Sequence, residues 1–314
     1  MRKNLLLCLL IAVSTTAQAQ YPERPTRVVS PFSPGGGLDI VARLIAPKLS
    51  EAYKQPVIVE NRTGANGQIA NEFVAKSTPD GYTLLIDTLG FAVHPAITKN
   101  LPYDPNTMVP VAQLLSLPFV IVVNPKVPAK TVTELIELAQ RAPGKLNFAQ
   151  GGLTNRILGE QFRLQTNVEF TFVPYKGSSP ATIAVVSGES DLTITDSATV
   201  APHIAAGKLR ALAVTSPKRT SLMPDVPTVG EAGVSKYEVT VWYGIFAPAG
   251  TPNEAVRRLN AEFNKIVMMP DVAARFTALG AEPVATSPED FAAMVRSQMA
   301  TVKDVATRAK IQVE

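Results

Sequence analysis

Short runs of β-branched and other apolar residues alternate with helical hydrophobic spacing along most of the chain. The first unit is a predicted strand at Thr26–Ser30 that ends in a glycine-rich turn, after which apolar residues recur at helical spacing over 40–45. Pro47 lies inside that helical pattern and lacks a backbone donor, so we expect the helix to kink there or to restart near Lys48. Such alternation of strands and helices predicts an α/β fold with parallel strands.

The alternation continues in two series of elements. The first series adds strands at Pro56–Glu60 and Thr83–Asp87, with a helix at Asn66–Lys76 between them. The second series is predicted to hold strands at Phe119–Val123, Leu146–Ala149, Glu169–Val173, Asp191–Thr195 and Ala211–Thr215, and helices at Thr133–Arg141, from the Gly151-Gly152 turn to about Leu164, and at Ala181–Ser187. An extended segment at Tyr237–Phe246 follows, and the rest is predicted to be mostly helical. Each series therefore predicts one doubly wound sheet.

The first nineteen residues have the pattern of a secretory signal. Arg2 and Lys3 precede an apolar run at Leu5–Val13, and Ala17–Ala19 fits a small-x-small cleavage site. The apolar run is shorter than the roughly 20 residues of a membrane span. Cys8, the one cysteine of the sequence, lies in this segment, so the mature chain would lack disulfides, cysteine zinc ligands and a cysteine nucleophile. We therefore expect residues 1–19 to be removed and the mature chain to be periplasmic.

The length and charge of the mature chain limit its organisation and its partners. Removal of nineteen of the 314 residues leaves 295, which is more than one hydrophobic core usually serves. We predict domain 1 at residues 20–123 plus 246–314 and domain 2 at 124–245, with crossings at Pro118–Asn124 and Val241–Pro248 that form a hinge. Without Arg2 and Lys3 the net charge is only +2, and no long basic run exists, so nucleic acid is not an expected partner.

The turn at Phe32–Asp39 is the strongest candidate for a ligand site. Its three consecutive glycines let a ligand approach the backbone, and the free N–H groups and dipole of the following helix favour an anion. The alternative is a tight turn in which Asp39 caps the helix. The segment is not a dinucleotide fingerprint, because a third glycine at the required spacing is missing, and no Gly-Lys-Ser/Thr follows as in a P-loop.

The segment Gly151–Arg156 repeats this device in the second series. Here Asn155 and Arg156 lie at the start of the helix, and the Arg156 guanidinium could bind a carboxylate with two hydrogen bonds. The alternative is an arginine that faces solvent or pairs with an acidic residue. Ligands of open α/β sheets bind beyond the carboxyl ends of the strands, so the two glycine turns could face each other across a cleft.

Signs of catalysis or of a bound cofactor are missing from the sequence. The two histidines, His94 and His203, each lie beside a proline, and no Gly-x-Ser-x-Gly nucleophile motif is present. Two isolated histidines without cysteines do not form a recognisable zinc set, and the carboxylates lack the spacing of a calcium loop. No metal and no cofactor are expected.

Many ordered motifs make the chain resemble a known family over essentially its full length. They are Tyr21-Pro22, Pro31-Phe32 with Pro34–Gly37 and Asp39, Val59–Arg62 with Gly64-Ala65 and Gly67, Pro79–Leu85, Leu101–Pro105, Val173–Gly177, Gly207–Ala213, Pro224–Thr228 and Ala247–Pro252. The chain resembles the extracytoplasmic receptors of tripartite tricarboxylate transporters, the TctC or Bug family. The resemblance implies a two-lobed periplasmic binding protein fold, of the type II-like Venus flytrap kind, that closes over an organic acid and delivers it to a membrane permease, as a monomer.

The resemblance also implies which residues hold the acid. One carboxylate would be bound by the loop that corresponds to Phe32–Asp39 and by the glycine-rich loop of the second lobe, with further residues around the same cleft. The predicted ligand-binding residues are Phe32, Ser33, Gly35, Gly36, Gly37, Leu38, Asp39, Thr88, Phe91, Gly152, Leu153, Thr154, Asn155, Arg156, Tyr175, Gly177, Asp196 and Trp242, and Lys176 lies between two of them.

Two departures from the family pattern bear on specificity. Arg156 stands where the family commonly has histidine, and Ser33 adds a hydroxyl where proline or alanine is more usual. Apolar walls could come from Phe32, Leu38, Phe91 and Leu153. If Arg156 meets a second carboxylate, the ligand is a dicarboxylate, and an aromatic one such as terephthalate fits those walls. Citrate, glutamate and nicotinate-like ligands stay open, as do a sensory adaptor and, with less support, an exported hydrolase.

Overall fold

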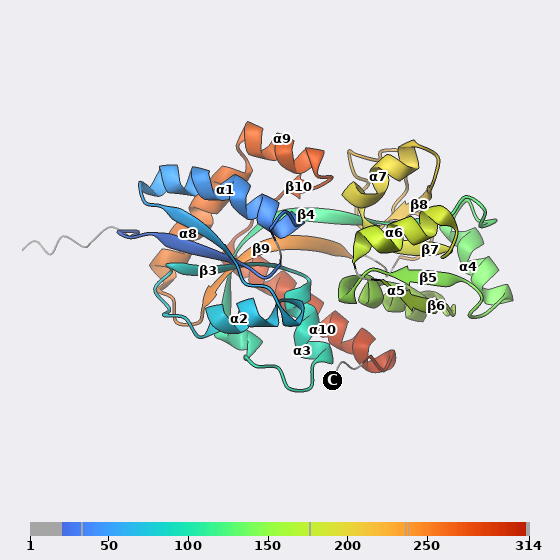
Figure 1. Cartoon of the computed structure of the whole chain (residues 1–314), viewed down its shortest axis with the longest axis horizontal. Coiled ribbons are helices and arrows are strands. Elements are labelled where there is room, and N and C mark those ends of the chain that lie inside the picture. The colour runs from blue at the N-terminus through green and yellow to red at the C-terminus, as the bar shows by residue number, and fades with distance from the viewer. Residues whose placement is uncertain (1–20, 33, 176, 236, 238, 312–314) are drawn as a thin grey trace, which may run out of the picture.

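The computed structural model describes residues 21–32, 34–175, 177–235, 237 and 239–311. It has two α/β lobes that lie side by side along the long axis of the molecule (Figure 1). The predicted signal segment and Ser33 lie outside the described residues. Strand pairing joins the described strands of both lobes into one path, β2-β1-β3-β9-β4-β7-β5-β6, with β10 and β8 also paired to β4. The predicted two-lobed fold is therefore confirmed.

Lobe 1 holds the first part of the chain and the last part. Its strands are β1 (Thr26–Ser30), β2 (Val57–Asn61), β3 (Thr83–Thr88), β9 (Thr240–Pro248), β10 (Glu282–Pro283) and the first part of β4 (Met108–Val123). Its helices are α1 (Gly37–Tyr53), α2 (Gln68–Ala75), α3 (Gly90–Ile97), α8 (Asn253–Val267), α9 (Pro270–Ala278) and α10 (Pro288–Arg308), with short 3₁₀ turns at Ala65–Gly67 and Pro105–Thr107. β1, β2 and β3 are parallel, and β9 runs antiparallel between β3 and β4.

Lobe 2 is built from the middle of the chain. Its strands are β5 (Asn147–Gln150), β6 (Thr171–Pro174), β7 (Leu192–Asp196), β8 (Arg210–Val214) and the end of β4. Its helices are α4 (Val132–Arg141), α5 (Leu153–Thr166), α6 (Ser178–Ser187) and α7 (Ser197–Ala205). β5, β6 and β7 are parallel to one another, and β4 is antiparallel to β7 and β8. The element types predicted from the hydrophobic pattern therefore recur in the structure, with shifted ends.

The long strand β4 belongs to both lobes. It pairs with β9 as far as Pro118 and with β7 from Phe119 onward. The predicted crossing at Pro118–Asn124 contains this change of partner, whereas 241–248 lies wholly in the lobe 1 sheet, paired with β4 from Thr240 onward. We accordingly propose lobe 1 as residues 21–118 plus 240–311 and lobe 2 as 119–239. Both of these lobe boundaries fall earlier in the chain than the predicted ones. The sequence could not place them, because a hydrophobic run does not reveal which strand it pairs with.

Thr215 forms hydrogen bonds with both segments that cross between the lobes, at Phe119 and at Val239. Its N–H donates to the Phe119 carbonyl at 2.8 Å, and its hydroxyl accepts from the Phe119 N–H at 3.2 Å. The same hydroxyl donates to the Val239 carbonyl at 2.7 Å, and the Val239 N–H donates to the Thr215 carbonyl at 2.9 Å. Both crossings thus meet at one fully buried residue of lobe 2.

Helix α1 continues through Pro47, so the predicted kink or restart is wrong. The proline ring faces solvent, while Val41, Ile45 and Leu49 on the other side are buried in the lobe 1 core. Burial of this apolar stripe stabilises the helix more than one missing backbone hydrogen bond destabilises it.

Candidate functional site

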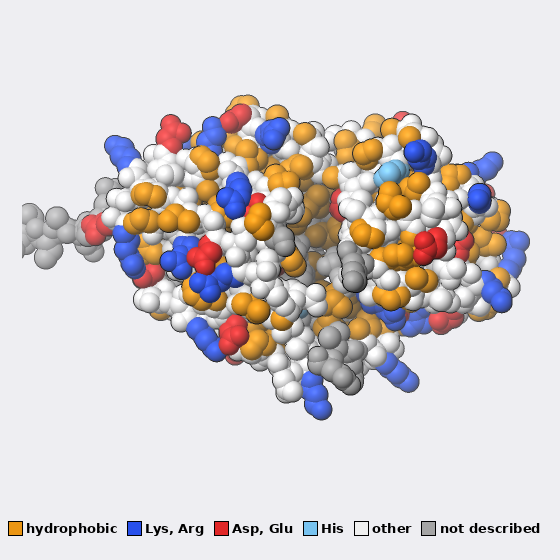
Figure 2. Space-filling view, in the orientation of Figure 1, with side chains coloured by type: hydrophobic (Ala, Val, Ile, Leu, Met, Phe, Trp, Pro, Cys, Tyr) orange, Lys and Arg blue, Asp and Glu red, His pale blue; other side chains and the backbone are white. Residues whose placement is uncertain are grey.

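The carboxyl ends of the parallel strands of both lobes point to the junction between the lobes. In lobe 1 the last residue of β3, Thr88, pairs with Tyr243 near the start of β9. In lobe 2 the last residue of β7, Asp196, pairs with Phe119, the first residue of β4 beyond the change of partner. Helices α1, α3, α5, α6 and α7 follow such strand ends, so their N-termini face the junction (Figure 1). Figure 2 shows the surface hollowed where the lobes meet.

The lobe 1 corner is braced by Asp39. This carboxylate is only 2% exposed and accepts hydrogen bonds from the Gly35 N–H at 2.8 Å, from Arg43 Nε at 2.9 Å and from Asn61 Nδ2 at 2.9 Å. Burial alone would raise the pKa of Asp39, but the three hydrogen bonds outweigh burial and hold that pKa below its ordinary value. Gly35 has φ +83°, a left-handed conformation that glycine adopts without strain. Asp39 therefore fixes the loop before α1 and has little capacity left for a ligand.

Three hydroxyl groups lie on the α1 side of the sheet at this corner. Ser30 follows Val28 on the same face of β1, and Thr88 follows Ile86 on the same face of β3; Val28 and Ile86 belong to the core that packs under α1. Tyr243 pairs directly with Thr88, and a Cβ on Gly37 would meet the Tyr243 hydroxyl at 2.5 Å. We call Ser30, Thr88 and Tyr243 the hydroxyl cradle.

The hydroxyl cradle has unused hydrogen-bonding capacity. The hydroxyls of Ser30 and Thr88 are buried, and neither has a hydrogen-bond partner among the described residues. Ser30 is fully buried, whereas Thr88 and Tyr243 are partly exposed at the junction. Buried polar groups normally have partners, and the N-terminus of α1 beside them carries a partial positive charge. The hydroxyls and the helix start together suit a bound anion.

The lobe 2 corner brings two helix starts together. Gly152, with φ +146°, precedes α5, and Gly177, with φ +116°, precedes α6. A Cβ on Gly151 would lie only 2.7 Å from the Cα of Ser178, so this close approach requires glycine. Leu153 and Thr154 are partly exposed in the first turn of α5. Backbone donors therefore face the junction from lobe 2 as well.

The charged and amide groups of the lobe 2 corner are mostly paired, although Arg156 Nε is buried without a partner among the described residues. Asn155 Nδ2 donates to the Ile194 carbonyl at 2.7 Å. Arg156 forms an ion pair with Glu160, which is 3% exposed, and its guanidinium lies 3.9 Å from the centre of the Phe172 ring. Arg163 Nε binds the other oxygen of Glu160 at 2.5 Å. For Arg156 the structure thus shows the alternative left open by the sequence, a pairing with an acidic residue.

Three apolar or aromatic residues of the predicted site lie in the core. Trp242 is fully buried and donates its indole N–H to Gln298 Oε1, and Phe91 stacks on Phe246 at 4.4 Å between ring centres. Leu38, the second residue of α1, is buried in the lobe 1 core. The prediction that these side chains line the cleft does not agree with their burial. Strand alternation explains Trp242, because its neighbour Tyr243 takes the opposite face.

The remaining predicted residues differ in their exposure and in their hydrogen-bond partners. Phe32 is exposed, and Ser33 and Lys176 lie outside the described residues. The Tyr175 hydroxyl donates to Glu189 at 2.8 Å. Asp196 caps α7 by accepting from the Thr199 N–H at 2.8 Å. Of the predicted residues, those at strand ends or helix starts that face the junction include Thr88, Gly36, Gly37, Gly152, Leu153, Thr154, Gly177 and Asp196.

Ser30 and Tyr243 were missed by the sequence interpretation. Ser30 is the polar last residue of its strand and follows the apolar pair Val28 and Val29, a signal that was available. Tyr243 follows Trp242 in the extended segment, and only the pairing of β9 with β3 shows which of the two faces α1. Burial first, and then the nearby Asp196 charge, raises the pKa of Tyr243. Tyr243 therefore stands close to groups from both lobes.

The structure offers no metal centre and no membrane helix in its described part. No three His, Cys, Asp or Glu side chains there are grouped to hold a metal ion. Nor is any helix over those residues long and apolar enough to span a bilayer.

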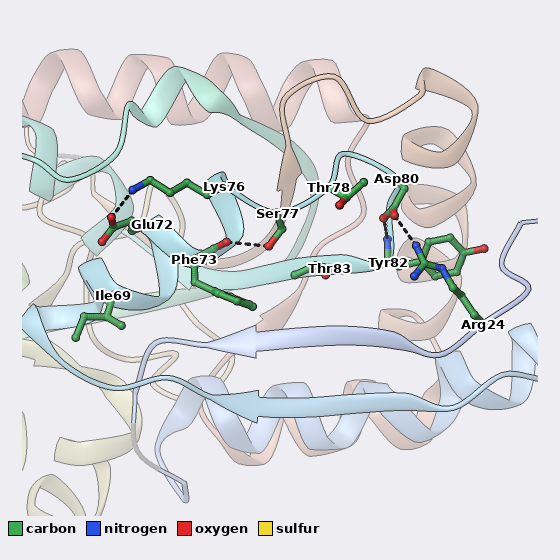
Figure 3. A pocket seen from close by; sticks show the side chains of 10 residues that line it. All are labelled: Arg24, Ile69, Glu72, Phe73, Lys76, Ser77, Thr78, Asp80, Tyr82 and Thr83. Atoms are coloured by element: carbon green, nitrogen blue, oxygen red, sulfur yellow. Dashed lines mark hydrogen bonds and ion pairs between the residues drawn. The ribbon is translucent and has the colours of Figure 1, made fainter.

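A pocket of about 600 Å³ lies elsewhere on lobe 1, between α2 and the start of β3 (Figure 3). Its charged side chains pair with each other, Arg24 with Asp80 at 2.5 Å and Lys76 with Glu72 at 2.6 Å. It adjoins Thr83, the first residue of β3, at the opposite end of the strand from Thr88. Because ligands of such sheets bind beyond the carboxyl ends of the strands, we take the junction and not this pocket as the functional site.

The fold and the anion-suited junction define a bilobed solute-binding protein. Residues 41–310 match the model of the tripartite tricarboxylate transporter family receptor, TctC. The chain belongs to this family of receptors.

Its relatives cover almost the whole chain. Protein BugT of Bordetella pertussis is 36% identical over 274 residues, 86% of this chain and 84% of BugT. A protein from the tcbD-tcbE intergenic region of a Pseudomonas species is 39% identical over 306 residues, 95% of this chain and 91% of that protein.

Solved structures agree with this assignment. R. palustris Rpa4515 with adipate has a TM-score of 0.80 at 37% identity and covers 93% of this chain and 99% of its own. MatC from Rhodopseudomonas palustris with bound malate has a TM-score of 0.77 at 32% identity and covers 91% of this chain and 99% of its own. The periplasmic binding protein BugD has a TM-score of 0.77 at 33% identity and covers 94% of this chain and 100% of its own. The neighbours are binding proteins, as the sequence interpretation expected of this chain.

Proposed function

We propose that this chain is a periplasmic receptor that captures a small carboxylate at the junction of its lobes and presents it to a membrane permease of a tripartite transporter. The observation that carries the proposal is the hydroxyl cradle beside the start of α1, where buried Ser30 and Thr88 hydroxyls lack partners among the described residues. A carboxylate supplies the acceptors that these donors need. The adipate and malate bound to two structural neighbours support this ligand class.

We further propose that the ligand is a dicarboxylate. One carboxylate would occupy the hydroxyl cradle and the start of α1, and the other would meet the backbone donors at the starts of α5 and α6 in lobe 2. A role for Arg156 in binding the second carboxylate would require it to leave Glu160, which would retain Arg163. The aromatic ligand terephthalate loses part of its support, because Phe91 and Leu38 are buried in the core. Aliphatic dicarboxylates fit the proposal because they do not require apolar side chains such as Phe91 and Leu38 around the ligand.

Calorimetric titration of the mature chain with a panel of acids tests the proposal. The panel pairs adipate with hexanoate and terephthalate with benzoate, and each binding acid is recovered and analysed afterwards. We expect at least one dicarboxylate to bind at least tenfold more tightly than its monocarboxylate partner and to be recovered unchanged. Failure of every acid to bind would contradict the receptor proposal, and conversion of the acid would favour an enzyme. A sensory adaptor of the same fold would bind in the same way, so a pull-down of the permease with the liganded receptor distinguishes transport.

A further inference from the structure

Helices α6 and α7 of lobe 2 start at the junction and contain no charged residue. Their sequences hold no Asp, Glu, Lys or Arg, whereas α4 and α5 of the same lobe hold three such residues each. Charges flank the pair instead. Glu189 and Lys208 follow the ends of α6 and α7 that lie away from the junction, Asp196 caps α7 at its start, and Lys176 precedes α6 in the sequence. Because α6 packs beside α7, the two helices form one uncharged stretch of surface.

Large apolar side chains are exposed in the same region. Ile183 on α6 is 53% exposed. In lobe 1, Phe32 and Ile40 are each 39% exposed and lie on either side of the glycine turn, Phe32 just after β1 and Ile40 in the first turn of α1. We call α6 and α7 together with Phe32 and Ile40 the mouth surface.

The mouth surface borders the junction from both lobes. Figure 1 shows the starts of α1, α6 and α7 turned toward each other across the junction, and Figure 2 shows apolar side chains on both sides of the hollow. Tyr243 connects the two sides. Its hydroxyl lies against Gly37 at the start of α1, while the charge of Asp196, at the start of α7, acts on it in addition to burial. A solute that enters or leaves the proposed site therefore passes beside this surface.

The composition of the mouth surface suits a protein partner. Exposed apolar patches mark interaction sites, and the cores of protein interfaces are depleted in charged residues, because an unpaired charge is costly to bury. A ligand held by the helix starts makes no use of Ile183, which lies in the second turn of α6. The chain belongs to a family of tripartite transporter receptors. A membrane component of the transporter is the partner that such a receptor has to meet, and the mouth is where its solute comes out.

We propose that the mouth surface is the docking site for the membrane permease, and that the permease meets it with an uncharged, largely apolar surface. The inference rests on the proposed function and names where the receptor contacts its partner. Because both lobes contribute to the mouth surface, closure of the lobes over a solute changes the spacing of its two parts. The permease thereby distinguishes a loaded receptor from an empty one.

The variants Ile183→Glu and Ile183→Lys place charges of opposite sign on the docking site. Glutamate and lysine are good helix formers and Ile183 is exposed, so both variants should fold and should bind the tightest acid of the panel within about twofold of the natural affinity. In the source bacterium, with its own gene replaced, each should lower uptake of that acid at least about tenfold, because either charge would be buried against an apolar partner. Ile40→Gln, which adds no charge beside the start of α1, should lower uptake about threefold.

The variants Ile58→Glu and Ile58→Lys are the matched controls. Ile58 is also 53% exposed, but it lies near the amino end of β2. Its side chain takes the face opposite to Val57 and Val59, which pack toward the core under α1. Both control variants should leave uptake within about twofold.

A photoreactive residue at position 183 gives a direct readout of the contact. In intact cells it should cross-link to the integral membrane protein of the transporter, and more strongly when the acid is supplied, whereas the same residue at position 58 should not. Normal uptake by the two Ile183 variants, or equal losses at Ile183 and Ile58, would overturn the inference and leave the receptor proposal intact. A mature chain that sediments as a dimer and becomes monomeric in Ile183→Glu would also overturn it, because the surface would then bind a second copy. Uptake that persists after deletion of the gene would instead contradict the proposed transport function itself.

Discussion

The glycine corners of the two lobes look alike in sequence but differ in how their polar groups are satisfied. In lobe 2, Asn155 is bonded to a carbonyl and the Arg156 guanidinium is paired with Glu160, although its Nε has no partner among the described residues. In lobe 1, the buried hydroxyls of Ser30 and Thr88 have no partner among the residues that the structure describes. Unsatisfied buried groups destabilise a free protein, so their presence beside a helix start indicates a role in binding. The cationic residue at one corner is thus a weaker guide to the ligand than the neutral hydroxyls at the other.

The largest expected effect comes from filling the lobe 1 corner. Gly37→Val places side-chain atoms where the Tyr243 hydroxyl lies, 2.5 Å from the added Cβ, and we expect at least a 100-fold loss of affinity for the tightest acid. The smaller change Gly37→Ala should weaken binding about tenfold in the natural sequence and no more than twofold in a Tyr243→Phe background, as calorimetry on the double-mutant cycle would show.

Gly230→Ala serves as the control for these glycine variants. Its added Cβ meets only the Thr228 hydroxyl, at an ordinary 3.7 Å, and should leave affinity unchanged. Equal effects of Gly37→Ala in both backgrounds would show that Tyr243 does not occupy the corner in solution.

A second unsatisfied group of lobe 1 predicts a pH effect on stability. Burial raises the pKa of Asp87 to about 7, and hydrogen bonds from Thr88 and Asn71 offset only part of that rise. The folded protein thus holds this proton more tightly than the unfolded chain. The resulting stability is fully present below about pH 3.8 and is lost as the pH rises through about 7.

Asp87→Asn should therefore gain stability relative to the natural protein as the pH rises. We expect the difference in unfolding free energy between them to shift by about 2 kcal/mol from pH 5 to pH 7.5, measured by urea denaturation. Burial also lowers the pKa of His94 to about 4. Both proteins contain His94, so its contribution cancels when the pH dependence of one unfolding free energy is subtracted from that of the other. If the difference in unfolding free energy does not change with pH, Asp87 has a hydrogen-bond partner or a water molecule in solution.

Ser30→Ala and Thr193→Val compare an unpaired hydroxyl of lobe 1 with a paired one of lobe 2. The fully buried Thr193 hydroxyl donates to the Ala149 carbonyl at 2.8 Å, so its removal should lower the unfolding free energy by about 1 kcal/mol and leave acid affinity within twofold. Ser30→Ala should leave stability unchanged or raise it, while weakening binding about fivefold. Loss of stability without loss of affinity in Ser30→Ala would make Ser30 a structural residue.

The smallest expected effect on binding is that of Arg156→Gln. Glu160 keeps Arg163 but loses one of its two guanidinium partners, so the unfolding free energy should fall by about 1 kcal/mol. We expect the ratio of terephthalate to benzoate affinity to stay within twofold. A selective tenfold loss of the dicarboxylate would restore Arg156 as a ligand-binding residue.

The strands and most helices could be predicted because their hydrophobic spacing is local. The first half of β4 was missed because Pro110 and Pro118 interrupt its pattern, and the strand carries a register shift after Pro110. Helix α3 was missed for a similar reason, since Pro95 lies inside it. The continuation of α1 through Pro47 depends on tertiary packing, which no local pattern reveals.

The candidate site was predicted as segments more than as side chains. The glycine corners follow from residue type and from their place after strands. Which side chains face the junction depends on strand pairing, as Trp242 and Tyr243 show by taking opposite faces of β9. The pairing of Arg156 had a local signal, because Glu160 and Arg163 follow at positions that share one helix face.

A crystal structure of the mature chain with the tightest acid of the panel would test the central claim most directly. We predict one carboxylate of that acid within hydrogen-bonding distance of the Ser30, Thr88 and Tyr243 hydroxyls and of the first N–H groups of α1. An acid bound elsewhere, with those three hydroxyls still unpaired, would contradict the account.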